Sequence, residues 1–298
     1  MKSNLALFIV ALVSWGFTWV VISETQVNID VDPVISVAWR FIISSFIIFA
    51  YLIYKKKQIH FSLKEHGFLI ILGLFLYSLN YIFFYKSNVY LISAMPAVVF
   101  CLMSVMNLIG EKFYFKKEVL PKTWLGALLG ILGIFIIFNK EILNFSFTIN
   151  THLGLFFALC ATASASMGNL LSEQNNRTLK IGIFESMSWS MFYGGLIALT
   201  IGLLDGAYPF IPLTDIKYML GMTYLIVFGS IVAFSFYLTL LKNIGPGRSG
   251  YIAVCMPVFA LIVSVIFEGL RPDGYLLIGL PITIIGLVLI LKQKSAKQ

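Results

Sequence analysis

The chain has 298 residues, of which 59% are hydrophobic and only 11% are charged. Soluble globular chains carry about 25% charged residues, so this chain has too little charge to cover a water-facing surface and is predicted to be an all-α membrane protein. The formal net charge is +8, but the basic residues are scattered over short loops. This excludes nucleic acid as a partner and is typical of the lysine-bearing loops of a multi-span protein.

Ten apolar segments follow one another along the chain, and each is predicted to be a transmembrane helix in a lipid bilayer. The segments are Leu5–Ile22, Val34–Ile53, Gly67–Tyr85, Leu91–Gly110, Thr123–Phe138, Leu153–Ser172, Ile181–Leu203, Tyr218–Leu241, Ser249–Phe267 and Tyr275–Leu291. The connections are short, so no soluble domain is expected.

The first segment carries Trp15, Thr18 and Trp19 at positions i, i+3 and i+4, which share one helical face. Trp15 is central, so it packs against a neighbour or lines a cavity. Trp19 lies near the outer end, where tryptophan forms an interfacial belt or a gate. We expect Trp15 and Thr18 to contact substrate and Trp19 to act in gating.

Arg40 is the only basic residue well inside a segment. A cation in hydrocarbon is costly and is usually paired or functional. Arg40 can bind a carboxylate of substrate or of the protein, and Glu24 and Asp32 near the same membrane face are candidate partners. We favour a structural or gating ion pair.

The third segment places Tyr77, Asn80, Tyr81 and Tyr85 at i, i+3, i+4 and i+8. An amide that donates and accepts, beside aromatic rings with hydroxyl tips, suits a small zwitterion or an amphipathic amine. The alternative is interhelical hydrogen bonding with an aromatic belt, to which Tyr85 is assigned. Tyr77, Asn80 and Tyr81 are the predicted binding residues.

In the second half, the candidate binding residues are Asn169, Ser235 and Tyr251. Glu185 occupies the position that corresponds to Arg40, at the opposite membrane face, and is assigned to gating. Pro257 is predicted to break the ninth helix and to act in gating, because a proline frees the carbonyl one turn earlier.

No metal or cofactor site is expected. Each of the three cysteines (Cys101, Cys160 and Cys255) lies in an apolar run and is interpreted as a packing residue. The three histidines have no metal-ligand spacing. Motifs of an intramembrane enzyme, such as His-Glu-x-x-His, are also absent from the sequence.

Landmarks recur in the same order five segments apart, which predicts two five-helix units at residues 1–145 and 146–298. The landmarks are Ser-Glu after the first and sixth segments, Glu111 and Glu268 after the fourth and ninth, and Gly126/Gly133 and Gly279/Gly286 in the fifth and tenth. Because five is odd, the second unit must be inverted in the membrane, as in many alternating-access carriers. Most lysine and arginine residues fall in loops on one side, which places both termini in the cytoplasm.

The chain resembles ten-helix members of the drug/metabolite transporter superfamily, of the EamA type. The resemblance rests on Trp15-Gly16, Arg40, the small-residue start and Pro257 of the ninth segment, and the two Gly-x6-Gly helices. It implies a central cavity lined by the first to fourth and sixth to ninth helices, with the fifth and tenth peripheral. It also implies transport, often export, of amino acids or other small metabolites.

We therefore expect an alternating-access transporter, an exporter or facilitator of amino acid-like metabolites in the cytoplasmic membrane, present as a monomer or homodimer. A proton-coupled drug/metabolite antiporter is the alternative. An intramembrane enzyme or a non-transporting scaffold is less favoured, because the sequence lacks catalytic pairs and a scaffold has no need of an inverted repeat.

Overall fold

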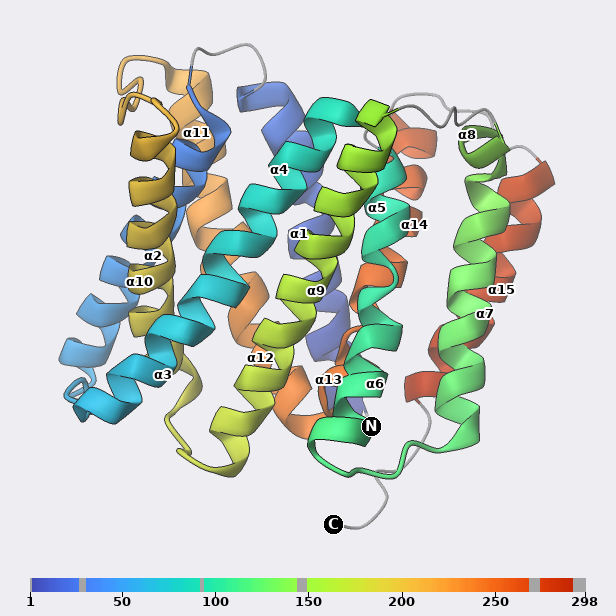
Figure 1. The fold of residues 1–298 in the computed structure, drawn as a ribbon, viewed down its shortest axis with the longest axis horizontal. Coiled ribbons are helices and arrows are strands. Elements are labelled where there is room, and N and C mark those ends of the chain that lie inside the picture. The colour runs from blue at the N-terminus through green and yellow to red at the C-terminus, as the bar shows by residue number, and fades with distance from the viewer. Residues whose placement is uncertain (1, 27–30, 92–93, 144–148, 268–273, 292–298) are drawn as a thin grey trace.

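The computed structural model describes residues 2–26, 31–91, 94–143, 149–267 and 274–291, which form one helical bundle (Figure 1). These residues form helices and no strand, which confirms the predicted all-α class. Within the described ranges, 6 helices are long and apolar enough to cross a membrane, and shorter apolar helices span Ser3–Thr18, Pro121–Ile137 and Gly274–Ile290. The chain is therefore a multi-pass membrane protein.

The helices differ widely in length and succeed one another with short connections. In chain order they are α1 (Lys2–Gln26), α2 (Pro33–Tyr54), α3 (Leu63–Leu74), η1 (Phe75–Leu79), α4 (Asn80–Tyr90), α5 (Ala94–Phe100), α6 (Met103–Tyr114), α7 (Pro121–Ile137), α8 (Asn139–Leu143), α9 (Ile149–Arg177), α10 (Ile183–Leu204), α11 (Ile216–Tyr224), η2 (Leu225–Val232), α12 (Ala233–Ile244), α13 (Pro246–Ser249), α14 (Ile252–Phe267) and α15 (Gly274–Leu291).

Two long helices each contain a π-helical segment. The segment η1 joins α3 to α4 in a continuous span over Leu63–Tyr90, and η2 joins α11 to α12 over Ile216–Ile244. A π-helical turn bonds residue i to i+5 and weakens the regular ladder, so it occurs mostly at functional positions. Both segments lie in the interior of the bundle, beside the cavity described below.

Polar side chains fix where several helices begin. Asp32 caps α2 by accepting hydrogen bonds from the backbone N–H groups of Val34 (2.7 Å) and Ile35 (3.2 Å). Asp215 caps α11 in the same way, accepting from the Tyr218 N–H at 2.9 Å. These carboxylates satisfy N–H groups that have no partner inside the helix.

The predicted break at Pro257 is wrong in position. The helix α14 continues through Pro257, and the chain instead turns at Gly250 and Tyr251, between α13 and α14. A proline leaves the carbonyl four residues earlier unpaired, which in α14 is that of Ala253. The thiol of Cys101 can donate to this carbonyl, at an Sγ–O distance of 3.5 Å, and it also lies 3.3 Å from the Ala97 carbonyl oxygen. A donor from the turn between α5 and α6 thus lies beside the carbonyl that the proline leaves unpaired.

Helices from the two halves pair with one another, and close approach of glycines holds one pair together. The pairs are α2 with α10, α4 with α9, α1 with α12, α6 with α13, and α7 with α15. Between α7 and α15, a Cβ added to Gly126 would lie 2.8 Å from the Gly286 carbonyl oxygen, and one added to Gly279 would lie 2.7 Å from the Gly133 carbonyl oxygen. The two Gly-x6-Gly motifs therefore pack directly against each other.

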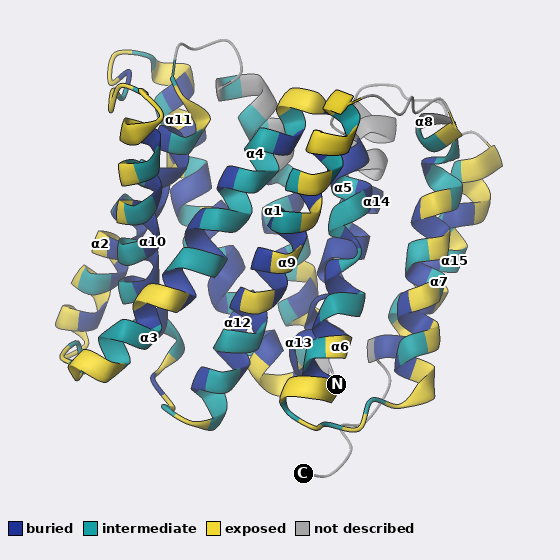
Figure 2. Ribbon diagram, in the orientation of Figure 1, coloured by how far each residue is buried: buried dark blue, intermediate teal, exposed yellow. Residues whose placement is uncertain are grey.

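Burial follows the bundle geometry. Figure 2 shows buried positions on the inner faces of the helices and exposed positions on outward faces and at the ends. Large apolar side chains such as Phe46, Leu128, Leu277 and Ile278 are exposed on the outside. In water such a surface would promote association, whereas in a bilayer it contacts lipid.

Candidate functional site

A cavity of about 350 Å³ lies inside the bundle. Its walls come from α1, α2, η1, α4, α5, α6, α9, α12 and α14, so both halves of the chain contribute. The aromatic lining residues are Trp15, Tyr81, Phe84, Tyr85, Phe100, Phe234 and Tyr237, and the polar ones are Thr18, Arg40, Asn80, Asn88 and Asn169. Aromatic walls with a few polar groups are typical of small-molecule sites.

Trp15 is fixed by both ends of its side chain. Its indole N–H donates to the carbonyl of Gly229 in η2 at 3.0 Å, and its ring lies 5.0 Å from Phe234 and 5.1 Å from Tyr237, centroid to centroid. The indole therefore joins α1 to the η2–α12 span. Trp15 and Thr18, both predicted binding residues, line the cavity on α1.

Arg40 reaches from α2 to the same π-helical segment. Its Nε donates to Ser230 Oγ at 2.7 Å, and its Nη2 donates to the Gly229 carbonyl oxygen at 2.8 Å. Its guanidinium carbon lies 5.3 Å from the ring centroid of Phe41 and 5.7 Å from that of Tyr81, within cation–π range. The described contacts of the guanidinium are therefore with a hydroxyl, a backbone carbonyl and two aromatic rings, all of which are uncharged.

Of the two carboxylates considered as partners of Arg40, the one that the structure describes does not fill that role. Asp32 caps the start of α2 instead. The side chain of Glu24 lies outside the described residues, as does that of Trp19, so the predicted gating role of Trp19 has no structural account.

Asn80, Tyr81 and Asn169, which were also predicted, line the cavity. Asn169 Nδ2 approaches Met103 Sδ at 3.5 Å, which joins α9 to α6. The Oδ1 atom of Asn80 is buried and has no hydrogen-bond partner among the described residues, and the same holds for the Oδ1 of Asn88. An unpaired buried acceptor costs about 1–3 kcal/mol, so these amides call for water or a polar ligand in the cavity.

Three predicted binding residues lie outside the cavity lining. Tyr77 is buried behind the wall, with its ring 5.2 Å from Phe41 and 4.8 Å from Phe234. Ser235 donates to the Val232 carbonyl oxygen in its own helix at 2.9 Å. Tyr251 turns toward α15 and donates to the Thr283 carbonyl oxygen at 2.8 Å.

Two predicted gating residues also lie away from the lining. Pro257 is within α14, and Glu185 lies in the first turn of α10, where a carboxylate interacts favourably with the helix dipole. Among the described residues, α10 contributes no side chain to the cavity, although the family resemblance implied that the seventh helix lines it.

Several lining residues were missed by the sequence reasoning. Tyr85 was assigned to an interfacial belt, and it lines the cavity together with Asn88. The spacing of Asn88 from Asn80 and Tyr81, at i+8 and i+7, places it on their helical face and could have identified it. Phe84, Phe100 and Phe234 gave no signal, because a phenylalanine in an apolar segment is usually a packing residue.

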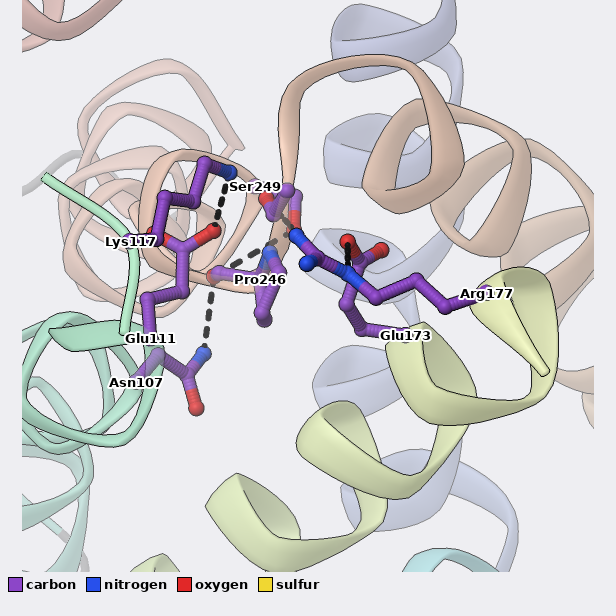
Figure 3. Close-up of polar contacts among 8 residues, drawn as sticks. Asn107, Glu111, Lys117, Glu173, Arg177, Pro246 and Ser249 are labelled. Atoms are coloured by element: carbon purple, nitrogen blue, oxygen red, sulfur yellow. Dashed lines mark hydrogen bonds and ion pairs between the residues drawn. The ribbon is translucent and has the colours of Figure 1, made fainter. Parts of the chain in front are cut away.

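A polar network lies at the end of the bundle where α1 begins, the lower end in Figure 1 (Figure 3). The carboxylate of Glu111, which is 3% exposed, accepts from Lys117 Nζ at 2.7 Å. Asn107 Nδ2 donates to the carbonyl of Pro246 at 2.9 Å and joins α6 to α13. On α9, Arg177 Nε pairs with Glu173 Oε1 at 2.7 Å.

This network continues the cavity walls. On α6, the cavity residue Met103 is followed at i+4 and i+8 by Asn107 and Glu111. On α9, Asn169 is followed at i+4 and i+8 by Glu173 and Arg177 in the same way. Residues four apart share a helical face, so the network lies directly beyond the cavity on the same faces.

Glycines make room for the network. A Cβ on Gly245 or Gly247 would clash with the Glu111 carboxylate, and Gly245 has a φ of +85°, a backbone conformation that favours glycine. The buried Arg248 of α13 interacts electrostatically with Glu111. The start of α13 therefore holds the carboxylate of α6 in a tight polar enclosure.

Residues 2–139 and 152–292 each match the EamA-like transporter family. The chain is similar to a protein named "Uncharacterized transporter" from Clostridium kluyveri, with 22% identity over 236 residues, 79% of this chain and 75% of that one. It is also similar to the "Uncharacterized transporter in trpA 3'region" of Buchnera aphidicola subsp. Schlechtendalia chinensis, with 25% identity over 261 residues, 87% of this chain and 83% of that one. A crystal structure of a protein with 17% identity shares the fold, with a TM-score of 0.80 over 97% of this chain and 96% of that chain.

Proposed function

Because the chain belongs to the EamA-like transporter family, we propose that it is an alternating-access carrier that moves an amino acid-like metabolite across the cytoplasmic membrane, as an exporter or facilitator. The observation that carries the proposal is the cavity of about 350 Å³ between the two halves. Its aromatic walls accept an apolar side chain, and its amides accept hydrogen bonds from an ammonium group. Pockets of roughly 300–1,000 Å³ are usual for small ligands.

An inverted repeat of two five-helix units, at residues 1–145 and 146–298, is part of this proposal. The helix pairs support it, because exchanging the halves maps α2–α10 and α7–α15 onto themselves, α1–α12 onto α9–α4, and α6–α13 onto α14–α5. The π-helical segments η1 and η2 occupy corresponding positions in the third and eighth predicted spans. We count α5–α6 and α13–α14 as one broken span each, which gives ten spans, so both termini lie on the same side. The excess of lysine and arginine in the loops on that side supports its being the cytoplasm.

Helix ends repeat in the same register. After α2, the N–H groups of Lys55, Lys56 and Lys57 donate to carbonyls in the last turn, at Tyr51, Ile53 and Leu52. After α10, the N–H groups of Asp205, Gly206 and Ala207 donate to Ile201, Leu203 and Gly202 in the same pattern. Matching C-terminal motifs five predicted spans apart support a common five-helix unit.

Alternating access requires that one end of the cavity be closed while the other is open. The network of Asn107, Glu111 and Lys117 supports a state closed at the end where α1 begins. In the proposed orientation this is the cytoplasmic end.

The cavity also bears on energy coupling. Among the described residues that line it, there is no Asp, Glu or His. A proton-coupled carrier usually places a titratable carboxylate near mid-membrane. This favours facilitated diffusion or exchange over the proton-coupled antiport considered as the alternative.

The test is uptake of radiolabelled amino acids into proteoliposomes, with and without a pH gradient. Asn80→Ala removes an amide from the cavity, and loss of a hydrogen bond to a charged group costs about 1.5–3 kcal/mol, so we expect uptake to fall about tenfold or more. Asn243→Ala is the matched control, since Asn243 is exposed and bonds Asn4 Oδ1 at 3.0 Å. Uptake of no amino acid by the unmodified protein would refute the substrate class, and equal uptake by both variants would refute the site.

A further inference from the structure

We propose that Arg40 is the anchor for a carboxylate group of the transported solute, an inference that rests on the function proposed above. It narrows the substrate class to carboxylate-bearing solutes and gives Arg40 a direct role in binding. Three properties of the side chain lead to this: its burial, the kind of partners it has, and the number of its N–H groups that remain available.

Burial makes an unneutralised cation unfavourable. Arg40 is 2% exposed and lies within α2, a helix long and apolar enough to cross the membrane. Moving an ion out of water costs several kcal/mol even after the protein relaxes, unless an anion neutralises it. Within the described part of the chain, the ion pairs are Lys86–Asp205, Lys117–Glu111 and Arg177–Glu173, and none involves Arg40.

The hydrogen bonds of Arg40 hold the guanidinium in place without neutralising it. Ser230 Oγ and the Gly229 carbonyl are both neutral acceptors, and they bind Nε and Nη2. A guanidinium has five N–H groups. Among the described residues these two bonds use only Nε and Nη2, which leaves both N–H groups of Nη1 for a ligand. Arg40 lines the cavity, where these remaining groups can meet a ligand.

A guanidinium in this setting is suited to a carboxylate. Two parallel N–H···O bonds form between the planar groups, and each is stronger than a neutral hydrogen bond. The rings of Phe41 and Tyr81 lie within cation–π range of the guanidinium and help to hold it in place. Asn80 and Asn88, whose Oδ1 atoms have no partner among the described residues, line the same cavity, and their amides can accept from an ammonium group, which completes a site for a zwitterion.

The experiment compares L-leucine, L-phenylalanine and L-threonine with their carboxamides, which lack the negative charge and keep the side chain and the ammonium group. Binding to the purified protein is measured by calorimetry, and uptake is measured in proteoliposomes. We expect each acid that binds to bind at least tenfold more tightly than its amide. In Arg40→Gln this ratio should fall to near one, with the affinity for the amide little changed.

Two further variants keep the test decisive. Ser230→Ala removes one hydrogen bond to Arg40 and keeps the charge, so the acid-to-amide ratio should stay above fivefold. Arg40→Lys keeps the positive charge but cannot form two parallel hydrogen bonds to a carboxylate, so the acid-to-amide affinity ratio should drop severalfold. If Arg40→Gln does not fold, the result for Arg40→Lys is used to test the proposal.

The possible outcomes separate the two proposals. Equal affinity for acid and amide in the unmodified protein, or an unchanged ratio in the Arg40 variants, would overturn the anchor while leaving the carrier function standing. If none of the acids and amides is taken up, the carrier function for amino acid-like solutes fails, and the anchor fails with it.

Discussion

The polar network at the end where α1 begins offers a direct test of gating, by the substitution Glu111→Gln. The carboxylate of Glu111 is 3% exposed and pairs with Lys117 Nζ at 2.7 Å. Glutamine keeps the shape of the side chain and removes the charge. The Lys117 pair is local to the end of α6, whereas the charge of Glu111 also interacts with Arg248 of α13, across the two halves, and this interaction would be lost when the halves separate. An interaction with a charged group contributes about 1.5–3 kcal/mol, so the expected loss of closed-state stability is about 2 kcal/mol.

If the closed state is destabilised by about 2 kcal/mol relative to the open state, the ratio of open to closed protein rises about 25-fold, since each 1.4 kcal/mol is a factor of ten in an equilibrium constant. The reporter is a cysteine at Ser104, a fully buried residue one turn from Asn107 on α6. Its labelling by a membrane-impermeant maleimide, added at the end where α1 begins, should rise by that factor in Glu111→Gln. The protein with its native Cys101, Cys160 and Cys255 alone supplies the background rate.

The matched control is Glu118→Gln, because Glu118 is exposed between α6 and α7 and carries the same charge. It should leave the labelling rate unchanged. If Glu111→Gln and Glu118→Gln label at the same rate, the network does not hold this end closed, and the assignment of a closed state at that end would be refuted.

Two further predictions concern stability in detergent, measured as thermal unfolding. Gly126→Ala should lower the unfolding temperature, because its Cβ would lie 2.8 Å from the Gly286 carbonyl oxygen and overpacking costs about 1–3 kcal/mol; Gly67→Ala, with no atom within 4 Å of the added Cβ, should not lower it. Cys101→Val should also destabilise, by about 1 kcal/mol, because it removes the thiol donor that the Ala253 carbonyl shares with the Ala97 carbonyl. Pro257→Ala restores the backbone N–H that bonds the Ala253 carbonyl, so Cys101→Val should lower the unfolding free energy much less in the Pro257→Ala background. An equal loss of stability in both backgrounds would contradict the role given to the thiol.

Helical spacing explains which cavity residues could be predicted. Trp15 and Thr18 share a face of α1, and Tyr81 is four residues from Tyr77 and Asn80 is three from it, so a polar side of an apolar segment was enough to select Trp15, Thr18, Asn80 and Tyr81. Spacing alone does not fix how far a cavity extends along a helix. This is why Tyr85, near the end of its segment, was assigned to an interfacial belt although it lines the cavity.

The π-helical segments account for one of the residues that spacing misplaced. Tyr77 and Asn80 are three apart and would share a face in a regular α-helix, but Tyr77 lies within η1 and Asn80 comes directly after it. A π-helical turn holds an extra residue, which rotates the residues before the turn by about 100° relative to the residues after it. Tyr77 consequently turns from the cavity toward Phe41 and Phe234. The sequence contains no signal for such a segment, because its residues are ordinary helix-forming ones.

The backbone of η2 positions two side chains of the cavity wall, the indole of Trp15 and the guanidinium of Arg40. Trp15 and Arg40, from two different helices, both donate to the Gly229 carbonyl, so the backbone of η2 sets where both side chains lie. A carboxylate that binds Arg40 would accept hydrogen bonds from the same guanidinium that donates to Ser230 and to the Gly229 carbonyl. Ligand binding and the geometry of the eighth span are therefore coupled through one side chain, at the point where the helical ladder is weakest.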